Sequence, residues 1–221
     1  MLFRSPTPIP TQEPTSTPTS PPTLRPSPSP TPGCNLLPND VDICLLIDGS
    51  ESIRQSQYAL VLKFTRSLVN SVYAISPKSL YSVVVFSSEV YTIKAINENA
   101  NATLPKLNNT YHPKEGTETV KGFNTCQATF PADGKPHIIL LLTDGDPNGL
   151  GSEDEELAAA TAAATAAKAN GTTIVSIGVG TLIATDNIVT WATNPKFAFT
   201  ATSFTTLQSI SNSIITQLTC V

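Results

Sequence analysis

The chain is poor in the features that mark several large classes of protein. Its 221 residues include two histidines, one tryptophan and one methionine, and only 14% of them are charged. The formal net charge is −4, so the chain lacks the basic excess that favours a nucleic-acid partner. No apolar run reaches the roughly 18 residues of a membrane span. What remains is a chain that is 40% hydrophobic and long enough to bury one sizeable core.

The N-terminus shows no secretory signal peptide. Residues 1–4 (Met-Leu-Phe-Arg) are followed almost at once by prolines, which leaves no room for an apolar h-region. Other features, described below, indicate an extracellular protein. We therefore expect that this sequence is a fragment of a longer chain or that its start is misplaced.

Residues 5–32 consist almost entirely of proline, threonine and serine. This composition cannot bury enough apolar surface to offset the cost of ordering, so it predicts an extended linker with polyproline II character. Serine and threonine mixed with proline are also typical of O-glycosylated stalks, and a plain spacer is the alternative. We therefore expect a disordered, Pro/Thr/Ser-rich stalk or linker at residues 1–33 and one folded domain at residues 34–221.

Apolar runs and amphipathic stretches alternate along the rest of the chain. We predict strands at residues 43–47, 80–87, 90–95, 136–143, 173–179 and 196–200, and helices at residues 52–72, 97–107, 119–130, 153–170, 186–193 and 204–218. Strands that alternate with helices are typical of βαβ units. The predicted fold is α/β: a doubly wound, mostly parallel sheet with helices on both faces and one antiparallel edge strand from the 80–95 hairpin.

Two of the four cysteines flank the predicted domain. Cys34 precedes the first strand and Cys220 is the next-to-last residue, so a bridge between them would tie the two ends together and add about 4–5 kcal/mol in the chain-entropy model. We predict this bridge, with two unpaired thiols as the alternative. Cys44 lies in the first strand and Cys126 in a later helical stretch. Because buried free cysteine is common, the sequence gives no reason to pair these two.

Three N-glycosylation sequons fall in stretches that look like loops, at Asn101, Asn108 and Asn170. Each match is short and weak alone. Together with the Ser/Thr/Pro stalk and the cysteines at the domain ends, they favour a glycoprotein in an oxidising, extracellular or cell-surface setting.

An acidic turn follows the first predicted strand. Asp48, Ser50 and Ser52 stand where that strand ends and a helix begins, which is where open α/β sheets bind their ligands. These side chains offer only oxygen, the ligand type of hard cations such as Mg²⁺ and Ca²⁺. A plain strand-to-helix turn with Ser52 as N-cap is the alternative interpretation.

A second acidic turn follows the second fully buried strand. Asp144 stands at its carboxyl end, as Asp48 does for the first. Two parallel central strands bring these ends to the same edge of the sheet, so Asp48 and Asp144 are expected to converge on one ion. Two carboxylates roughly balance a divalent cation, and neutral hydroxyls complete its shell without further charge.

These motifs resemble the von Willebrand factor type A (vWA) domain. The resemblance rests on Asp-Gly-Ser-Glu-Ser at residues 48–52, Gly-Thr at 116–117 and Leu-Thr-Asp-Gly at 142–145, and it covers about residues 41–219. It implies the family's Rossmann-like fold and its metal-ion-dependent adhesion site (MIDAS). The implied metal ligands are Asp48, Ser50, Ser52, Thr117 (with Thr119 as the less favoured choice) and Asp144.

The resemblance also implies how such a site works. It would hold Mg²⁺, or else Mn²⁺ or Ca²⁺, and leave one coordination position for an acidic side chain of a partner protein. Glu51 departs from the family pattern, in which a small residue usually stands between the two serines. An extra carboxylate near the site would tighten the cation but repel an acidic ligand, and the alternative is that the Glu51 side chain points to water.

Two competing signals are weaker in context. The segment from Asp144 to Glu155 matches the EF-hand loop pattern, but a strand precedes it where an EF-hand needs a helix. Ser50 lacks the Gly-x-Ser-x-Gly elbow of a hydrolase nucleophile. His137 adjoins a buried strand and reads as structural, and His112 reads as a surface residue near the site. We therefore predict that the protein is not an enzyme.

The sequence thus predicts an extracellular, cation-dependent adhesion module on a proline-rich stalk, which binds an acidic residue of an extracellular or cell-surface protein through the metal. The alternative is a structural glycoprotein module of a cell wall or extracellular matrix, in which the metal only stabilises the loops.

Overall fold

The computed structural model describes residues 36–37, 40–108, 110–147, 151–181 and 184–219, with the backbone alone for residues 94–97. In chain order its elements are β1 (Asp42–Asp48), α1 (Gln55–Ile75), β2 (Leu80–Phe86), β3 (Val90–Glu98), α2 (Ala100–Leu107), α3 (Thr119–Thr129), β4 (His137–Thr143), α4 (Glu153–Ala169), β5 (Thr173–Val179), α5 (Thr185–Trp191), the 3₁₀ turn η1 (Pro195–Phe197), β6 (Ala198–Ala201), the 3₁₀ turn η2 (Leu207–Ile210) and α6 (Ser211–Thr219).

The six strands form one sheet in the order β3-β2-β1-β4-β5-β6. Every neighbouring pair is parallel except β2 and β3, the antiparallel hairpin at one edge. The predicted fold class is therefore confirmed. The chain runs outward from β1 to β3 and then returns to β4 on the other side of β1. This reversal opens a crevice at the carboxyl ends of β1 and β4, the place where doubly wound sheets bind ligands.

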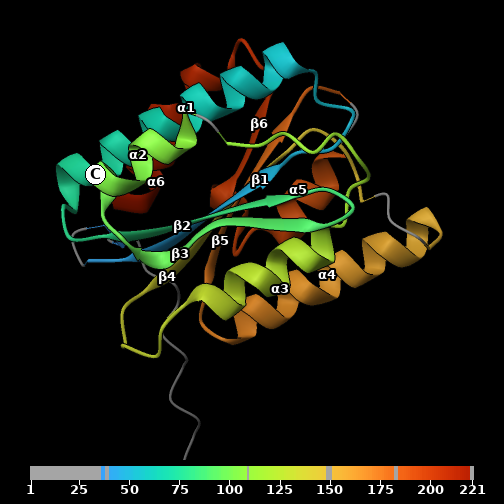
Figure 1. Ribbon diagram of the computed structural model, residues 1–221. Coiled ribbons are helices and arrows are strands. Elements are labelled where there is room, and N and C mark those ends of the chain that lie inside the picture. The colour runs from blue at the N-terminus through green and yellow to red at the C-terminus, as the bar shows by residue number, and fades with distance from the viewer. Residues whose placement is uncertain (1–35, 38–39, 109, 148–150, 182–183, 220–221) are drawn as a thin grey trace, which may run out of the picture. The chain divides into compact units, whose positions relative to one another are not determined.

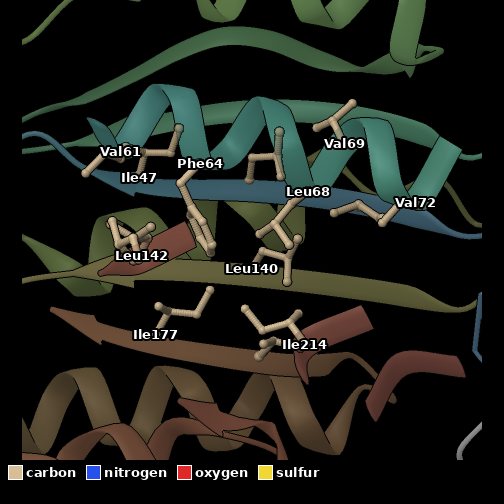
Figure 2. Close-up of a cluster of buried hydrophobic side chains, with 14 of the residues drawn as sticks. Ile47, Val61, Phe64, Leu68, Val69, Val72, Leu140, Leu142, Ile177 and Ile214 are labelled. Atoms are coloured by element: carbon tan, nitrogen blue, oxygen red, sulfur yellow. The ribbon is translucent and has the colours of Figure 1, made fainter. Parts of the chain in front are cut away.

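Helices cover both faces of the sheet (Figure 1). One face packs against α1, α2 and α6, and the other against α3, α4 and α5. Figure 2 shows the first of these two cores, where Phe64 and Leu68 of α1 lie over Leu140 and Leu142 of β4 and Ile214 comes from α6. Because β1, β4 and β5 are buried on both faces, their sequences read as continuous apolar runs.

Some predicted boundaries were wrong. Helix α1 begins at Gln55 with Arg54 as its N-cap, so Ser52 is not the cap that the plain-turn interpretation required. Pro195 starts a 3₁₀ turn and delays β6 to Ala198, because proline fixes its own φ and lacks a donor for the sheet. The single predicted last helix is divided into η2 and α6.

The structure pairs the two cysteines that the sequence left unpaired. Cys44 of β1 and Cys126 of α3 form a disulfide with a Cα–Cα distance of 5.7 Å, and both residues are fully buried. The sequence left the state of these two cysteines open, and the structure shows that they are paired. Cys34 and Cys220 lie outside the described residues, so their bridge stays a prediction. Among the described residues, no helix is long and apolar enough to cross a bilayer.

Candidate functional site

The turn after β1 is folded around the Asp48 carboxylate. Oδ1 of Asp48 accepts the backbone N–H of Ser50 at 2.8 Å, which curls the chain back over the strand end. The Ser50 and Ser52 hydroxyl oxygens lie 2.8 Å apart, and the Ser52 hydroxyl donates to Oδ1 of Asp144 at 2.7 Å. Four of the five predicted ligands, Asp48, Ser50, Ser52 and Asp144, are therefore linked in one network of polar contacts.

Thr143 ties the end of β4 to the same turn. Its hydroxyl lies 2.5 Å from Oδ2 of Asp48, to which it donates, and 3.0 Å from the carbonyl oxygen of Gly145. Thr143 belongs to the Leu-Thr-Asp-Gly motif at residues 142–145, from which no role was predicted for it. Its place as the last residue of a buried strand, beside Asp144, was the signal that pointed to this contact.

The loop at residues 113–118, which carries Thr117, pairs with the turn after β1 through Lys114 and Glu115. The Lys114 N–H donates to the Gly49 carbonyl at 2.9 Å, and the Glu51 N–H donates to the Glu115 carbonyl at 2.9 Å, so the two loops pair like short parallel strands. Thr117 is 7% exposed at this edge. As far as the structure describes the chain, its hydroxyl is outside the network above, and Thr119 is already the first residue of α3.

The tip of the β2–β3 hairpin holds the loop at residues 113–118 in place. The hydroxyls of Ser87 and Ser88 accept the backbone N–H groups of Glu115 and Gly116 at 3.0 and 2.9 Å, and the Ser87 carbonyl accepts the N–H of Glu118 at 2.8 Å. These serines were missed, because their partners lie about 28 residues away in the sequence.

Gly49 is required where these loops touch. A Cβ at this position would lie 2.7 Å from Cγ1 of Val85 and 2.8 Å from Cδ of Pro113, both too close, whereas a Cβ on Gly145 would meet nothing within 4 Å. We predict that Gly49→Ala lowers the free energy of unfolding by about 2–3 kcal/mol through overpacking. The matched control Gly145→Ala should change it by less than about 1 kcal/mol. Urea denaturation of both variants checks this, and equal losses would contradict the close-approach argument.

Burial makes the two carboxylates costly to ionise. Asp48 is fully buried and Asp144 is 4% exposed. Loss of solvent, and to a smaller extent the nearby Asp144 charge, raises the pKa of Asp48 to about 6 against the opposing effect of its hydrogen bonds. Burial raises the pKa of Asp144 as well. Two buried acids surrounded by hydroxyl oxygens fit a divalent cation, which would supply the missing positive charge.

Two predictions near the site need correction. His112 is buried rather than on the surface: its ring stacks on Tyr58, and its Nε2 lies 3.4 Å from the Ser50 carbonyl oxygen. The EF-hand alternative is not supported, because its would-be twelfth ligand, Glu155, is used elsewhere. The Glu155 carboxylate accepts the N–H of Ser152 and caps the start of α4.

The three sequon asparagines are all exposed, but they are not all in loops. Asn101 lies in the first turn of α2, whereas Asn108 and Asn170 follow the ends of α2 and α4. The loop assignment was wrong for Asn101, and glycosylation at all three stays a prediction.

Comparison with known proteins agrees with this architecture. The mouse (Mus musculus) collagen alpha-4(VI) chain is 25% identical over 199 residues, covering 85% of this chain and 8% of the collagen chain. Mouse matrilin-2 is 26% identical over 188 residues, covering 79% of this chain and 18% of matrilin-2. The chain thus spans less than a fifth of either relative.

Among solved structures, proximal thread matrix protein 1 from the mussel byssus is 25% identical with a TM-score of 0.72, covering 84% of this chain and 49% of that one. The same mussel protein has also been solved with a zinc-occupied MIDAS motif, at 24% identity and a TM-score of 0.70. The family match is to the von Willebrand factor type A domain and extends over residues 42–213. This chain therefore belongs to the von Willebrand factor type A domain family.

Proposed function

We propose that this domain binds a divalent cation through Asp48, Ser50, Ser52, Thr117 and Asp144, with Mg²⁺ as the expected ion and Mn²⁺ or Ca²⁺ as substitutes. The observation that carries the proposal is the Ser52–Asp144 hydrogen bond, which joins loops 92 residues apart in a cluster of oxygen atoms only. Octahedral oxygen coordination with retained water suits Mg²⁺.

The bound ion would recruit a partner carboxylate. Asp48 and Asp144 together carry two negative charges when ionised, which a divalent cation only balances, and the hydroxyl ligands add none. The ion therefore keeps attraction for one further anion. A water molecule on the ion can give way to a glutamate or aspartate side chain of an extracellular or cell-surface protein.

The setting that we propose is extracellular. Residues 1–33 would act as a stalk that holds the domain away from its anchoring structure, and a Cys34–Cys220 bridge would fasten the domain ends beside it. The buried Cys44–Cys126 disulfide supports an oxidising compartment. The similarity to a collagen chain and to a byssus matrix protein agrees with a role in a matrix. We propose a binding module rather than an enzyme.

Peptide arrays test the adhesion function directly. We expect the full chain to bind some immobilised peptides that contain a single glutamate when Mg²⁺ is present, and to lose that binding in EDTA. Each peptide has a matched control in which glutamine replaces the glutamate. Binding that survives both EDTA and the glutamine replacement would reject the metal-bridged mechanism.

One observation favours the structural alternative, in which the metal only stabilises the loops. Glu51 is exposed beside the proposed metal ligands, where its charge would repel an acidic peptide. If adhesion is the function, Glu51→Gln should tighten Mg²⁺-dependent peptide binding several-fold. If Mg²⁺ raises the melting temperature but neither the wild-type protein nor the Glu51→Gln variant binds any peptide, the structural role is preferred.

A further inference from the structure

A second cluster of possible metal ligands lies at the other end of the central strands. Asp42 begins β1 and His137 begins β4, and the two residues are direct partners in the parallel register. Asp133 comes from the loop before β4. The candidate ligand atoms of these three residues lie within 4.8 Å of one another. Asp42 and His137 stand at the amino-terminal ends of β1 and β4, whereas Asp48 and Asp144 stand at the carboxyl ends of the same strands. This cluster is therefore separate from the proposed adhesion site.

Two atoms of the cluster lack the partners that buried polar groups need. Within the described part of the chain, Oδ2 of Asp42 and Nε2 of His137 are buried and have no hydrogen-bond partner. Asp42 is fully buried, so water does not compensate its carboxylate. An unpaired buried carboxylate oxygen is costly, and such an atom in a native fold points to an ion or ligand.

A lysine already brings one positive charge to this place. The Lys135 ammonium lies 3.4 Å from Oδ1 of Asp42 and 2.9 Å from Oδ2 of Asp133. It satisfies neither Oδ2 of Asp42 nor Nε2 of His137. Its side chain is 31% exposed, so it can withdraw into solvent when another cation enters.

We propose that Asp42, Asp133 and His137 form a zinc site that fastens the amino-terminal ends of β1 and β4 to the loop before β4. One imidazole nitrogen and two carboxylate oxygens suit Zn²⁺, whereas Mg²⁺ and Ca²⁺ prefer oxygen alone. The two carboxylates balance the charge of the ion once Lys135 leaves. Water would complete a tetrahedral shell.

The geometry requires a small closure around the ion. Ligand atoms on tetrahedral zinc lie about 3.3 Å apart, which follows from bonds of about 2.0–2.1 Å. Asp133 is the exposed member and sits on a loop, so it is the ligand that moves. His137 is held in place, because its ring stacks on Phe130 at a centroid distance of 4.4 Å and an interplanar angle of 5°.

NMR of the histidine rings tests this proposal, because the chain contains only two histidines. The full chain is titrated with Zn²⁺ in excess Mg²⁺, so that Mg²⁺ occupies the first site. We expect the ring signals of His137 to shift and those of His112, which lies beside Ser50, to stay. Unchanged His137 signals at millimolar Zn²⁺ would overturn the proposal.

Two variants sharpen the test. His137→Gln should reduce Zn²⁺ affinity at least tenfold in isothermal titration calorimetry, and Lys135→Met should raise it about tenfold, because it removes the competing ammonium. Lys63→Met, on the exposed side of α1, is the matched control and should change nothing. At a Zn²⁺ concentration one hundred times Kd, the wild-type melting temperature should rise by about 5–10 °C. A Lys135→Met variant that binds Zn²⁺ no more tightly than wild type would mean that the ammonium and the ion do not compete for the Asp42 and Asp133 carboxylates, and would overturn the proposal.

Discussion

Replacing Asp48 with asparagine is expected to abolish the Mg²⁺-dependent stabilisation of the domain, with a loss of Mg²⁺ affinity of at least about 100-fold. Mutation of residues that merely orient a metal ligand costs about 10–100-fold, so loss of a charged ligand should cost more. Asparagine has nearly the same side-chain shape as aspartate, so the substitution leaves the packing of the turn unchanged. Oδ1 of the asparagine can still accept the Ser50 N–H, and its amide can donate to the Thr143 hydroxyl, which then donates to Gly145.

The same variant should make the metal-free domain more stable at pH 7. Burial raises the pKa of Asp48 to about 6 in the folded state, above its unfolded value of about 3.9. The stability that this carboxyl contributes is therefore fully present below about pH 4 and is lost as the pH rises through 6. The loss amounts to about 3 kcal/mol. Asparagine does not ionise, so the variant should not show this loss.

Thermal unfolding in EDTA and in Mg²⁺, from pH 4 to 8, measures both effects. The wild-type domain should gain more from Mg²⁺ at pH 7 than at pH 5, because the ion binds the ionised carboxylate. Asp146→Asn is the matched control, since the Asp146 carboxylate accepts from Asn187 rather than from the cluster. An Asp48→Asn variant that Mg²⁺ stabilises as much as wild type would reject the proposed ligand set.

Removing the Cys44–Cys126 disulfide should be the most damaging change to stability. The bridge joins residues 82 positions apart, so the chain-entropy model predicts a loss of about 4–5 kcal/mol in the free energy of unfolding. It also fastens α3 to β1, and α3 begins two residues after Thr117. We therefore expect Mg²⁺ affinity to fall together with stability.

A double-mutant cycle isolates the contribution of the bridge. Cys44→Ala and Cys126→Ala each break the same bond, so the double variant should be little less stable than either single variant. Guanidinium denaturation of the four proteins provides the comparison. If each single variant instead loses only about 1–2 kcal/mol in the free energy of unfolding, and the two losses add in the double variant, the cysteines contribute as two separately packed side chains and not through a bond.

The fold was largely readable from the sequence because its central strands are buried on both faces. Strands β1, β4 and β5 have no polar face, so each reads as one apolar run between turn signals. Helix α4 was equally clear, since its sequence is rich in alanine and Gly171 marks its end, where the structure shows a φ of 83°. The predicted boundaries of the last helix were wrong, because the apolar spacing continues through a segment that folds as the 3₁₀ turn η2 followed by α6.

The disulfide was not readable from the sequence. Pairing depends on how closely α3 packs over β1, which is set by Gly122. A Cβ on that residue would lie only 2.9 Å from Cδ1 of Leu46. Sequence spacing carries no information about such an approach between a helix and a strand 70 or more residues apart.

The sequence by itself determined the α/β class and the meeting of Asp48 with Asp144, because both follow from the order of apolar runs and from the shared edge of parallel strands. Only the tertiary structure decided what supports that meeting: the Thr143 hydroxyl, the hairpin serines Ser87 and Ser88, and the burial of His112. Those contacts are single hydrogen bonds and close packing between distant segments. They depend on distances of a few ångströms after folding, which no local pattern of residues encodes.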